Sequence, residues 1–195
     1  MQGGPVFEKL TSRENPKVKL AHKLWDRRGR EKSGLFLIEG FRELSRALEG
    51  NEEIETLLIC PELFLGSNED TLIAEVQKKR ARVFRLTEQL FRHLSYRDRP
   101  DGILAIAKQR HKTLADLPEV ENPLYLVAEA IEKPGNLGTI LRSADAAGVT
   151  AVIVCDRTTD IHNPIVMHKE MFELSFTLHL PFNERYIALL NALVA

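Results

Sequence analysis

Two apolar runs, with a glycine-bearing loop and a helical pattern between them, constrain the fold of this chain most: Leu124–Ala128 and Ala151–Cys155. The order strand, loop, helix, strand is that of a βαβ unit with parallel strands. In such a unit the helix N-terminus presents unpaired N–H groups and a partial positive charge above the strand ends. We therefore expect the chemistry of this protein around Asn136 and Arg142.

The loop and the helix after it suggest how these side chains are presented. Gly135 and Gly138 allow a tight turn, and Asn136 is placed to cap a helix that follows Gly138. The loop matches neither a Walker A sequence nor a dinucleotide-binding fingerprint. Arg142 and Asp145, three residues apart, form either a surface ion pair or part of a functional site. The expected buried face of the helix comprises Ile140, Leu141, Ala144 and Ala147.

Composition indicates an ordinary globular protein. A chain of 195 residues with 44% hydrophobic content can form one large domain or two small ones. The N-terminus is polar and no apolar run is long enough to span a membrane, so we expect a cytoplasmic protein that does not bind membranes. Cys60 and Cys155 end apolar runs, which predicts buried, reduced thiols rather than a disulfide or metal set.

Charge is strongly segregated along the chain. Residues 1–38 carry nine Lys/Arg and four Asp/Glu (+5), whereas residues 39–77 carry two and ten (−8). Residues 78–112 carry eleven and three (+8), and residues 113–195 carry five and eleven (−6). If the fold gathers the two basic blocks, they form a stripe that follows a phosphate backbone. The alternative is that they are solvated helix faces.

The hydrophobic period alternates between helix and strand through the first half, which predicts a small α/β sandwich. A helix with a basic polar side starts at Asn15-Pro16 and runs past Arg28. Further helices are expected at 41–48, around 72–76 and at 88–94, and strands at 35–38, 56–60, 82–86 and 103–107. Two prolines and a change of charge sign mark a linker. The predicted domains are therefore residues 1–112, a linker at 113–123, and a second domain at 124–195.

Taken together, these motifs resemble a known family. Pro134 to Gly148, set between two strands, closely resembles the first signature motif of the SpoU-type RNA 2'-O-ribose methyltransferases of the SPOUT superfamily. Ser12 to Lys19, Phe36 to Gly40 and Asp101 to Ala105 resemble that family's N-terminal RNA-binding domain. That domain is similar to ribosomal proteins that bind kinked RNA. The implied fold is this α/β domain followed by the first part of a parallel-sheet, trefoil-knot methyltransferase domain.

The resemblance implies an activity. Asn136 and Arg142 would lie in the active site, where S-adenosylmethionine donates a methyl group to a ribose 2'-hydroxyl of ribosomal or transfer RNA. The reaction must stabilise the negative charge that develops on the attacking oxygen, and a guanidinium does so electrostatically. Arginine is always protonated, so Arg142 is expected to activate the hydroxyl by charge rather than as a base. Family members also resemble one another as homodimers with the active site at the subunit interface.

The RNA-binding half supplies a second set of candidates. We expect phosphate contacts from basic side chains beside turns and helix ends, and an RNA contact from Glu39 through its match to the family. His22 and His93 lie in basic segments and suit either a phosphate contact or a solvated surface. The partner is structured RNA, not DNA. The basic candidates are Lys17, Lys19, Arg27, Arg28, Arg97 and Arg99.

The resemblance decays after Asn163-Pro164. The family's later motifs, which build most of the cofactor pocket and the knot, do not follow, and residues 181–195 have helical spacing. His168 and His179 have apolar neighbours and are expected to be structural. Three explanations stay open: a fragment of an active methyltransferase, a noncatalytic RNA-binding relative, or a chain that completes its site with a partner. The predicted function is RNA 2'-O-methylation, with noncatalytic RNA binding as the alternative.

Overall fold

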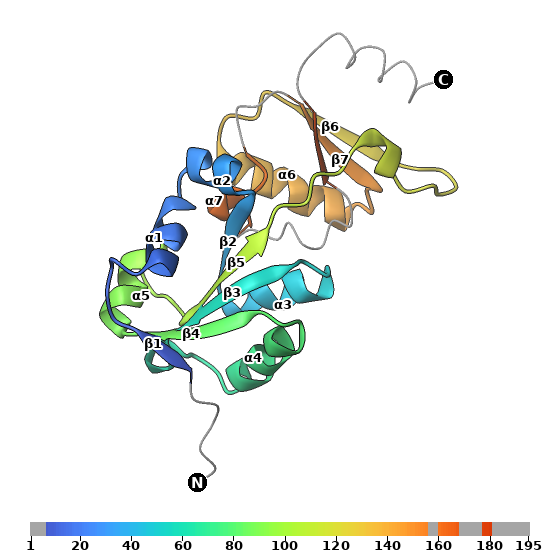
Figure 1. The fold of residues 1–195 in the computed structure, drawn as a ribbon. Coiled ribbons are helices and arrows are strands. Elements are labelled where there is room, and N and C mark those ends of the chain that lie inside the picture. Colours follow the sequence, from blue (N-terminus) through green and yellow to red (C-terminus); the bar gives the residue numbers. More distant parts are fainter. Residues whose placement is uncertain (1–6, 156–159, 168–176, 181–195) are drawn as a thin grey trace. The chain divides into compact units, whose positions relative to one another are not determined.

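The computed structural model describes residues 7–155, 160–167 and 177–180. The chain forms two compact units, Met1–Gln109 and Arg110–Ala195, each considered by itself (Figure 1). The predicted linker, residues 113–123, falls within the second unit and contains a 3-10 turn, Leu114–Asp116. The division of labour between the predicted domains stays a prediction.

The first unit is built on a five-stranded sheet in the order β1-β4-β3-β5-β2. β4 pairs in parallel with β1 and β3, whereas β5 is antiparallel to both β3 and β2. All strands predicted in this half are present, and the short β1 is an additional one. The strands are β1 (Glu8–Leu10), β2 (Leu35–Glu39), β3 (Ile54–Ile59), β4 (Arg82–Leu86) and β5 (Ile103–Lys108).

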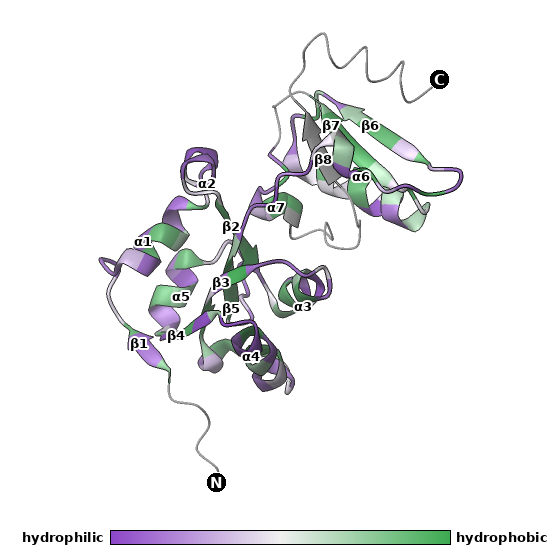
Figure 2. Ribbon diagram, turned by 45° about the vertical axis from the view of Figure 1, so that its right-hand side comes forward, coloured by the Kyte–Doolittle hydropathy of each residue, from purple (hydrophilic) through white to green (hydrophobic). Residues whose placement is uncertain are grey.

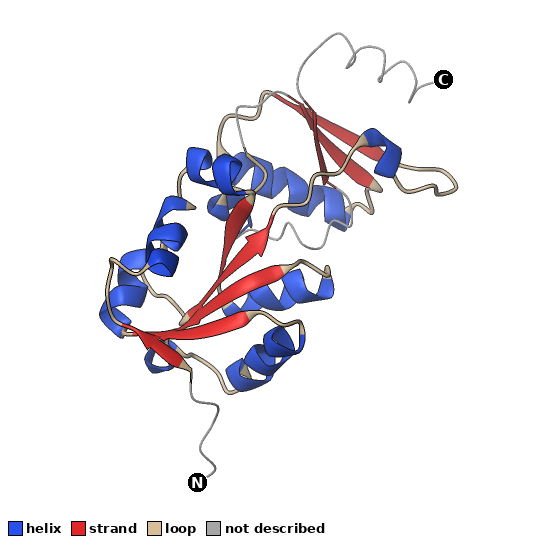
Figure 3. Ribbon diagram, in the orientation of Figure 1, coloured by secondary structure: helices blue, strands red, loops and turns tan. Residues whose placement is uncertain are grey.

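Both faces of this sheet are covered, so successive residues are buried even on the edge strand β2. Leu35 and Leu37 lie in the core under α1 (Pro16–Lys23) and α5 (Glu88–Leu94). The intervening Phe36 and Ile38 are also buried, on the opposite face. The helices α3 (Phe41–Glu49) and α4 (Glu69–Lys78) cover that face (Figures 1 and 3). The central strands are mainly hydrophobic in Figure 2, as strands covered on both faces should be.

Local signals account for the helix boundaries. The Asn15 Oδ1 atom accepts a hydrogen bond from the Lys17 N–H (2.9 Å), and Thr87 Oγ1 accepts one from Leu90 N–H (3.4 Å), so both residues cap the helices that they precede. α3 ends at Gly50. The remaining helices of the unit are α2 (Arg27–Ser33) and a 3-10 turn at Pro61–Leu63.

The prediction of one basic helix running past Arg28 is wrong, because α1 ends before Leu24 and α2 starts after Asp26. The cause is Arg30, which is buried although it is charged. Its Nη1 atom donates hydrogen bonds to the carbonyl oxygens of Leu24 (2.8 Å) and Trp25 (2.9 Å). These carbonyls at the end of α1 are therefore satisfied without continuing the helix.

The second unit contains the predicted βαβ element. β6 (Tyr125–Glu129), β7 (Ala151–Cys155) and β8 (Thr177–Leu180) form a parallel sheet in that order, and α6 (Pro134–Ala146) connects β6 to β7. A short helix, α7 (Pro164–Met167), follows. The buried residues of α6 are Leu137, Gly138, Leu141 and Ala144. Leu141 and Ala144 were predicted to be buried, whereas the predicted Ala147 is exposed.

Some expectations fall outside the described residues, namely the helix at 181–195 and His168. His179 lies on β8, in a strand as expected. Among the described residues, every helix is too short or too polar to cross a membrane.

Candidate functional site

The start of α6 differs from the sequence prediction in one respect that matters for the site. The helix begins at Pro134 with Lys133 at the N-cap, so Asn136 lies inside the first turn and does not cap it. The Asn136 N–H donates to the Lys133 carbonyl oxygen (2.9 Å). Proline starts the helix early because its fixed φ suits the first helical position and its missing N–H would be unpaired there. Gly138 is consequently a buried helical residue rather than part of the loop.

Arg142 is half-buried on α6, two turns into the helix. Its Nη2 atom donates a hydrogen bond to Thr139 Oγ1 (3.2 Å), and that hydroxyl in turn donates to the Gly135 carbonyl oxygen (2.9 Å). Within the described residues Arg142 forms no ion pair with Asp145, the alternative that the spacing left open. A neutral hydroxyl thus orients the guanidinium and leaves its charge uncompensated by those residues. Thr139 is not among the site residues predicted from the sequence, because a threonine at helical spacing carries no signal of its own.

The structure does not bring Asn136 and Arg142 together. Both lie on α6, six residues apart, which corresponds to about 9 Å along the helix axis and to different sides of the helix. Asn136 is exposed. A ligand that contacts both side chains has to extend along nearly two turns of α6.

The loop between β6 and α6 has an unusual backbone conformation. Ala130 has φ +51°, in the left-handed region that a non-glycine residue rarely adopts. Its N–H donates to the Cys155 carbonyl oxygen (3.2 Å), which ties the ends of β6 and β7 together. Burial, with a smaller contribution from Glu129, raises the pKa of the Cys155 thiol. Cys155 is therefore a packing residue and not a nucleophile.

Cys60 has the same character in the first unit. Burial, followed by its hydrogen bond to Glu62, raises the pKa of the Cys60 thiol to about 11. Both cysteines are buried, which confirms that part of the sequence prediction, and neither forms a disulfide in this structure. Among the described residues, no three His, Cys, Asp or Glu side chains come together as metal ligands.

In the first unit, Glu39 proves to be an internal residue at the end of β2, with 7% exposure. Its carboxylate accepts hydrogen bonds from the Ser95 hydroxyl and from the Tyr96 N–H (3.0 Å). A buried carboxylate with two such donors fixes the backbone that follows α5. The environment of Glu39 therefore indicates an indirect role, in which it orders the segment that begins at Ser95.

Arg97, which follows Tyr96, also contacts the end of β2, and its side chain is only 20% exposed. Its guanidinium bonds to the carboxylates of Glu43 (2.7 Å) and Asp101 (3.4 Å) and to the Glu39 carbonyl oxygen (2.9 Å). Asp101 also accepts from the Phe41 N–H (2.8 Å), at the start of α3. Arg97 thus cross-links two loops, and most of its charge is used inside the protein.

Gly40 makes this cross-link possible. Its φ is +116°, and a Cβ atom built there would come within 2.1 Å of a Glu43 carboxylate oxygen and 2.4 Å of Arg97 Nη2. Only glycine fits the space and adopts this conformation without strain.

The other side chains predicted to contact RNA differ in whether they have partners within the protein. Lys17 lies over the Phe84 ring, with its Nζ 4.9 Å from the ring centroid. Lys19 pairs with Glu14, and Arg27 pairs with Glu31 (2.9 Å). These three side chains have local structural partners. Those that are exposed with no acidic partner among the described residues are Arg28 and Arg99.

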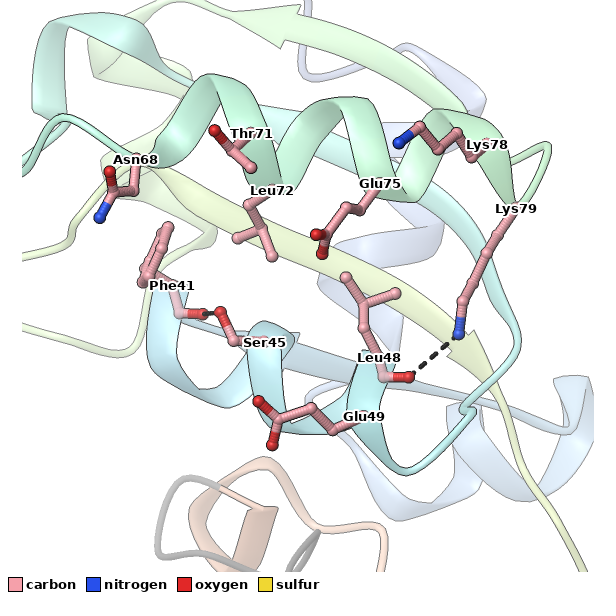
Figure 4. Close-up of a pocket in the computed structure, with 10 residues that line it drawn as sticks. All are labelled: Phe41, Ser45, Leu48, Glu49, Asn68, Thr71, Leu72, Glu75, Lys78 and Lys79. Atoms are coloured by element: carbon pink, nitrogen blue, oxygen red, sulfur yellow. Dashed lines mark hydrogen bonds between the residues drawn. The ribbon is translucent and has the colours of Figure 1, made fainter.

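A groove of about 590 Å³ lies between α3 and α4 (Figure 4). Leu48 and Leu72 contribute apolar surface, and Lys79 closes one end by donating to the Leu48 carbonyl oxygen (3.0 Å). Glu49 and Glu75 also line it. None of the predicted site residues lines this groove, so it is separate from both candidate sites.

Comparison with protein families divides the chain in the same way as the fold. Residues 15–105 match the MRM3-like substrate binding domain, and residues 123–191 match the SpoU rRNA Methylase family. A curated relative, the 23S rRNA (guanosine(2553)-2'-O)-methyltransferase RlmP of Bacillus subtilis, is 32% identical over 157 residues, which cover 80% of this chain and 58% of the relative. The chain spans little more than half the length of the first curated relatives it matches.

Solved structures agree with these matches. An RNA 2'-O ribose methyltransferase is 32% identical with a TM-score of 0.73, and the alignment covers 95% of this chain and 69% of that one. An AdoMet-bound rRNA methyltransferase from Sinorhizobium meliloti is 27% identical with a TM-score of 0.82, again over 95% of this chain and 69% of the other. The α/β fold class expected from the sequence is therefore confirmed.

Proposed function

Because the chain belongs to the SpoU family of rRNA methylases, we propose that it takes part in methylation of ribosomal RNA at a ribose 2'-hydroxyl, with S-adenosylmethionine as methyl donor. The observation that carries the proposal is Arg142, a half-buried guanidinium on the helix of a parallel βαβ unit, within the region that matches the family model. Its charge is uncompensated by the described residues, as the reaction requires.

Arg142 meets the main chemical difficulty of this reaction. A ribose hydroxyl does not ionise at neutral pH, so negative charge grows on its oxygen only as that oxygen attacks. A guanidinium already held by Thr139 stabilises that charge without reorganising, while the bond between the sulfonium sulfur and the methyl group breaks and the hydroxyl proton passes to water. Asn136, exposed in the first turn of α6, is proposed to hold the RNA backbone or ribose through its carboxamide.

The described residues fit the methyl donor only in part. S-adenosylmethionine supplies an activated methyl group, and its adenosine has to be enclosed by a pocket. Residues 129–133, between β6 and α6, are exposed or half-buried and suit one wall of such a pocket. The opposite wall is not formed by the described residues. Within the proposal it comes from the rest of the second unit or from the second subunit of a homodimer, and we assign no residue to the cofactor.

The first unit is proposed to bind the RNA. It matches a substrate binding domain and carries both basic blocks of the sequence. Two buried free thiols suit a reducing compartment, so we place the protein in the cytoplasm, where it would act in rRNA processing.

The first test is calorimetric titration of the 195-residue chain with S-adenosylmethionine, followed by transfer of radiolabelled methyl groups to rRNA. Micromolar binding and label in ribose 2'-O-methyl nucleotides are expected. A folded sample that binds RNA but neither binds the cofactor nor transfers methyl groups would favour the noncatalytic alternative. Sedimentation in the same buffer tests the homodimer.

RNA binding itself has a separate test. If the basic blocks bind phosphates, affinity for an rRNA fragment should fall steeply as salt rises, by about tenfold or more between low and physiological concentration. A flat dependence would contradict the basic stripe.

A further inference from the structure

Four aromatic rings form two stacked pairs on the surface shared by α1 and α5. His22 stacks on His93 with centroids 5.5 Å apart, and Trp25 stacks on Tyr96 at 5.6 Å. The interplanar angles are 20° and 29°. Within each segment the two rings are three residues apart in the sequence: His22 and His93 lie in the last turns of α1 and α5, and Trp25 and Tyr96 lie just beyond the ends of these helices. We call His22, Trp25, His93 and Tyr96 the ring row.

The Trp25–Tyr96 pair is held in place from both sides. Trp25 packs against the core, and its Nε1–H donates to the Leu94 carbonyl oxygen (2.8 Å). The Tyr96 N–H is fixed by the buried Glu39 carboxylate (3.0 Å). The ring that these contacts present is nonetheless 62% exposed. A large aromatic ring that stacks on a hydrogen-bonded tryptophan, follows an anchored backbone and is left in water is a prepared stacking surface, because part of its conformational entropy is already lost before binding.

Exposed charged side chains follow in the same segments as the ring row. Lys23 on α1, Arg28 on α2 and Arg99 beyond α5 are exposed and have no acidic partner among the described residues, and Asp26 and Asp98 are exposed carboxylates in these segments. The acidic side chains Glu14 and Glu88 are paired with Lys19 and Arg92. Aromatic faces next to uncompensated cations are the combination that binds single-stranded nucleic acid, since bases stack and phosphates pair.

We infer that the ring row is a binding site for unpaired RNA bases, with an exposed base stacking on the outer face of Tyr96. The inference rests on the proposed function for the presence of RNA, and adds the class of RNA that is recognised: a loop or bulge rather than a continuous duplex. A paired base is shielded from Tyr96 within its own helix, whereas an unpaired base offers a free face. The buried Glu39 acts here as a positioning residue, because it holds Tyr96.

Trp25 provides a direct measurement, since it is the only tryptophan of the chain. The intact chain is titrated with a short oligoadenylate and, separately, with an abasic ribose-phosphate strand of the same length. Stacking on the pair is expected to quench Trp25 fluorescence with oligoadenylate only. Equal quenching by both strands would mean that charge alone is sensed, and would overturn the inference.

Variants at Tyr96 complete the test. Tyr96→Ala should weaken oligoadenylate binding about tenfold, which corresponds to about 1.4 kcal/mol, whereas Tyr96→Phe keeps the ring and should bind like the wild type. Leu65→Ala, at another exposed apolar side chain of the unit (77% exposed), is the matched control. Unchanged affinity in Tyr96→Ala would overturn the inference.

The two proposals fail independently. Arg142→Ala should leave oligoadenylate quenching unchanged, because it lies in the other unit. A chain that quenches normally but transfers no methyl group would contradict the proposed function alone. Loss of discrimination between the two strands, with methyl transfer intact, would contradict the ring row alone.

Discussion

Two turns from strand to helix in this protein are built in opposite ways. Between β2 and α3, Glu39, Arg97 and Asp101 satisfy one another and the backbone inside the protein. Between β6 and α6, the loop residues are exposed or half-buried, and Arg142 on the helix is oriented only by Thr139 among the described residues.

The comparison distinguishes an arginine whose charge stabilises the fold from one whose charge stays available to a ligand. A guanidinium bonded to two carboxylates has its field cancelled locally, so Arg97 stabilises the fold and offers little to a ligand. A guanidinium held by a hydroxyl keeps its field, at a cost in stability that its half exposure makes small. Identical side chains, Arg97 packed against one turn and Arg142 on the helix after the other, therefore take different roles, and their hydrogen-bond partners decide which.

The largest expected effect is on catalysis. Arg142→Ala should lower the rate of methyl transfer about a hundredfold to a thousandfold, because the developing charge loses its stabiliser. RNA affinity and melting temperature should stay near the wild type. Asp145→Asn, which changes charge on the same helix, serves as the control. A rate within about threefold of the wild type would show that Arg142 has no catalytic role.

On the other turn the effect should be on stability. Gly40→Ala is expected to lower the free energy of unfolding by about 3 kcal/mol, because φ +116° with ψ 150° is a conformation that only glycine adopts without strain, and a Cβ there also displaces the ends of the Glu43 and Arg97 side chains. Gly34→Ala is the control for an ordinary left-handed position, because Gly34 has φ +68° and ψ 20° and has nothing within 4 Å of its Cβ position. It should cost about 1 kcal/mol. Equal losses in urea titrations would show that the backbone and the contacts of Gly40 add nothing to the cost of an ordinary left-handed glycine.

Arg97→Gln tests the charge network itself. It should lower the free energy of unfolding by about 2 kcal/mol, less than a fully buried pair would lose, because Arg97 is partly exposed. Arg92→Gln breaks an exposed pair with Glu88 and should cost under about 0.5 kcal/mol. If the two variants lose the same unfolding free energy, Arg97 contributes no more to stability than an exposed arginine does.

The smallest effect concerns pH and the ring row. Burial, then the positive charges of Arg13 and His22, lower the pKa of His93. The unfolded chain therefore binds a proton at higher pH than the folded one, and stability is lost as pH falls below about 6.5. The wild type should lose slightly more stability than His93→Gln between about pH 8 and about pH 5, by under 0.5 kcal/mol for so exposed a group. An opposite sign in thermal melts would refute this.

Much of the fold could be read from the residues. Apolar runs located the predicted strands, and Asn15, Thr87 and Gly50 marked helix ends, because these signals act over a few residues. The parallel βαβ unit around α6 followed from the same local pattern. The break between α1 and α2 did not, since it depends on Arg30 folding back onto Leu24 and Trp25.

For the sites, the sequence by itself determined which residues carry chemistry: the motif that contains Asn136 and Arg142, and the basic blocks of the first unit. Only the tertiary structure decided what each side chain does. It turned Glu39 and Arg97 inward, gave Arg142 a neutral partner in Thr139, and stacked Tyr96 on Trp25. The reason is physical: local conformation depends on neighbouring residues, whereas burial and pairing depend on groups that lie far apart in the sequence, as Trp25 and Tyr96 do at 71 positions.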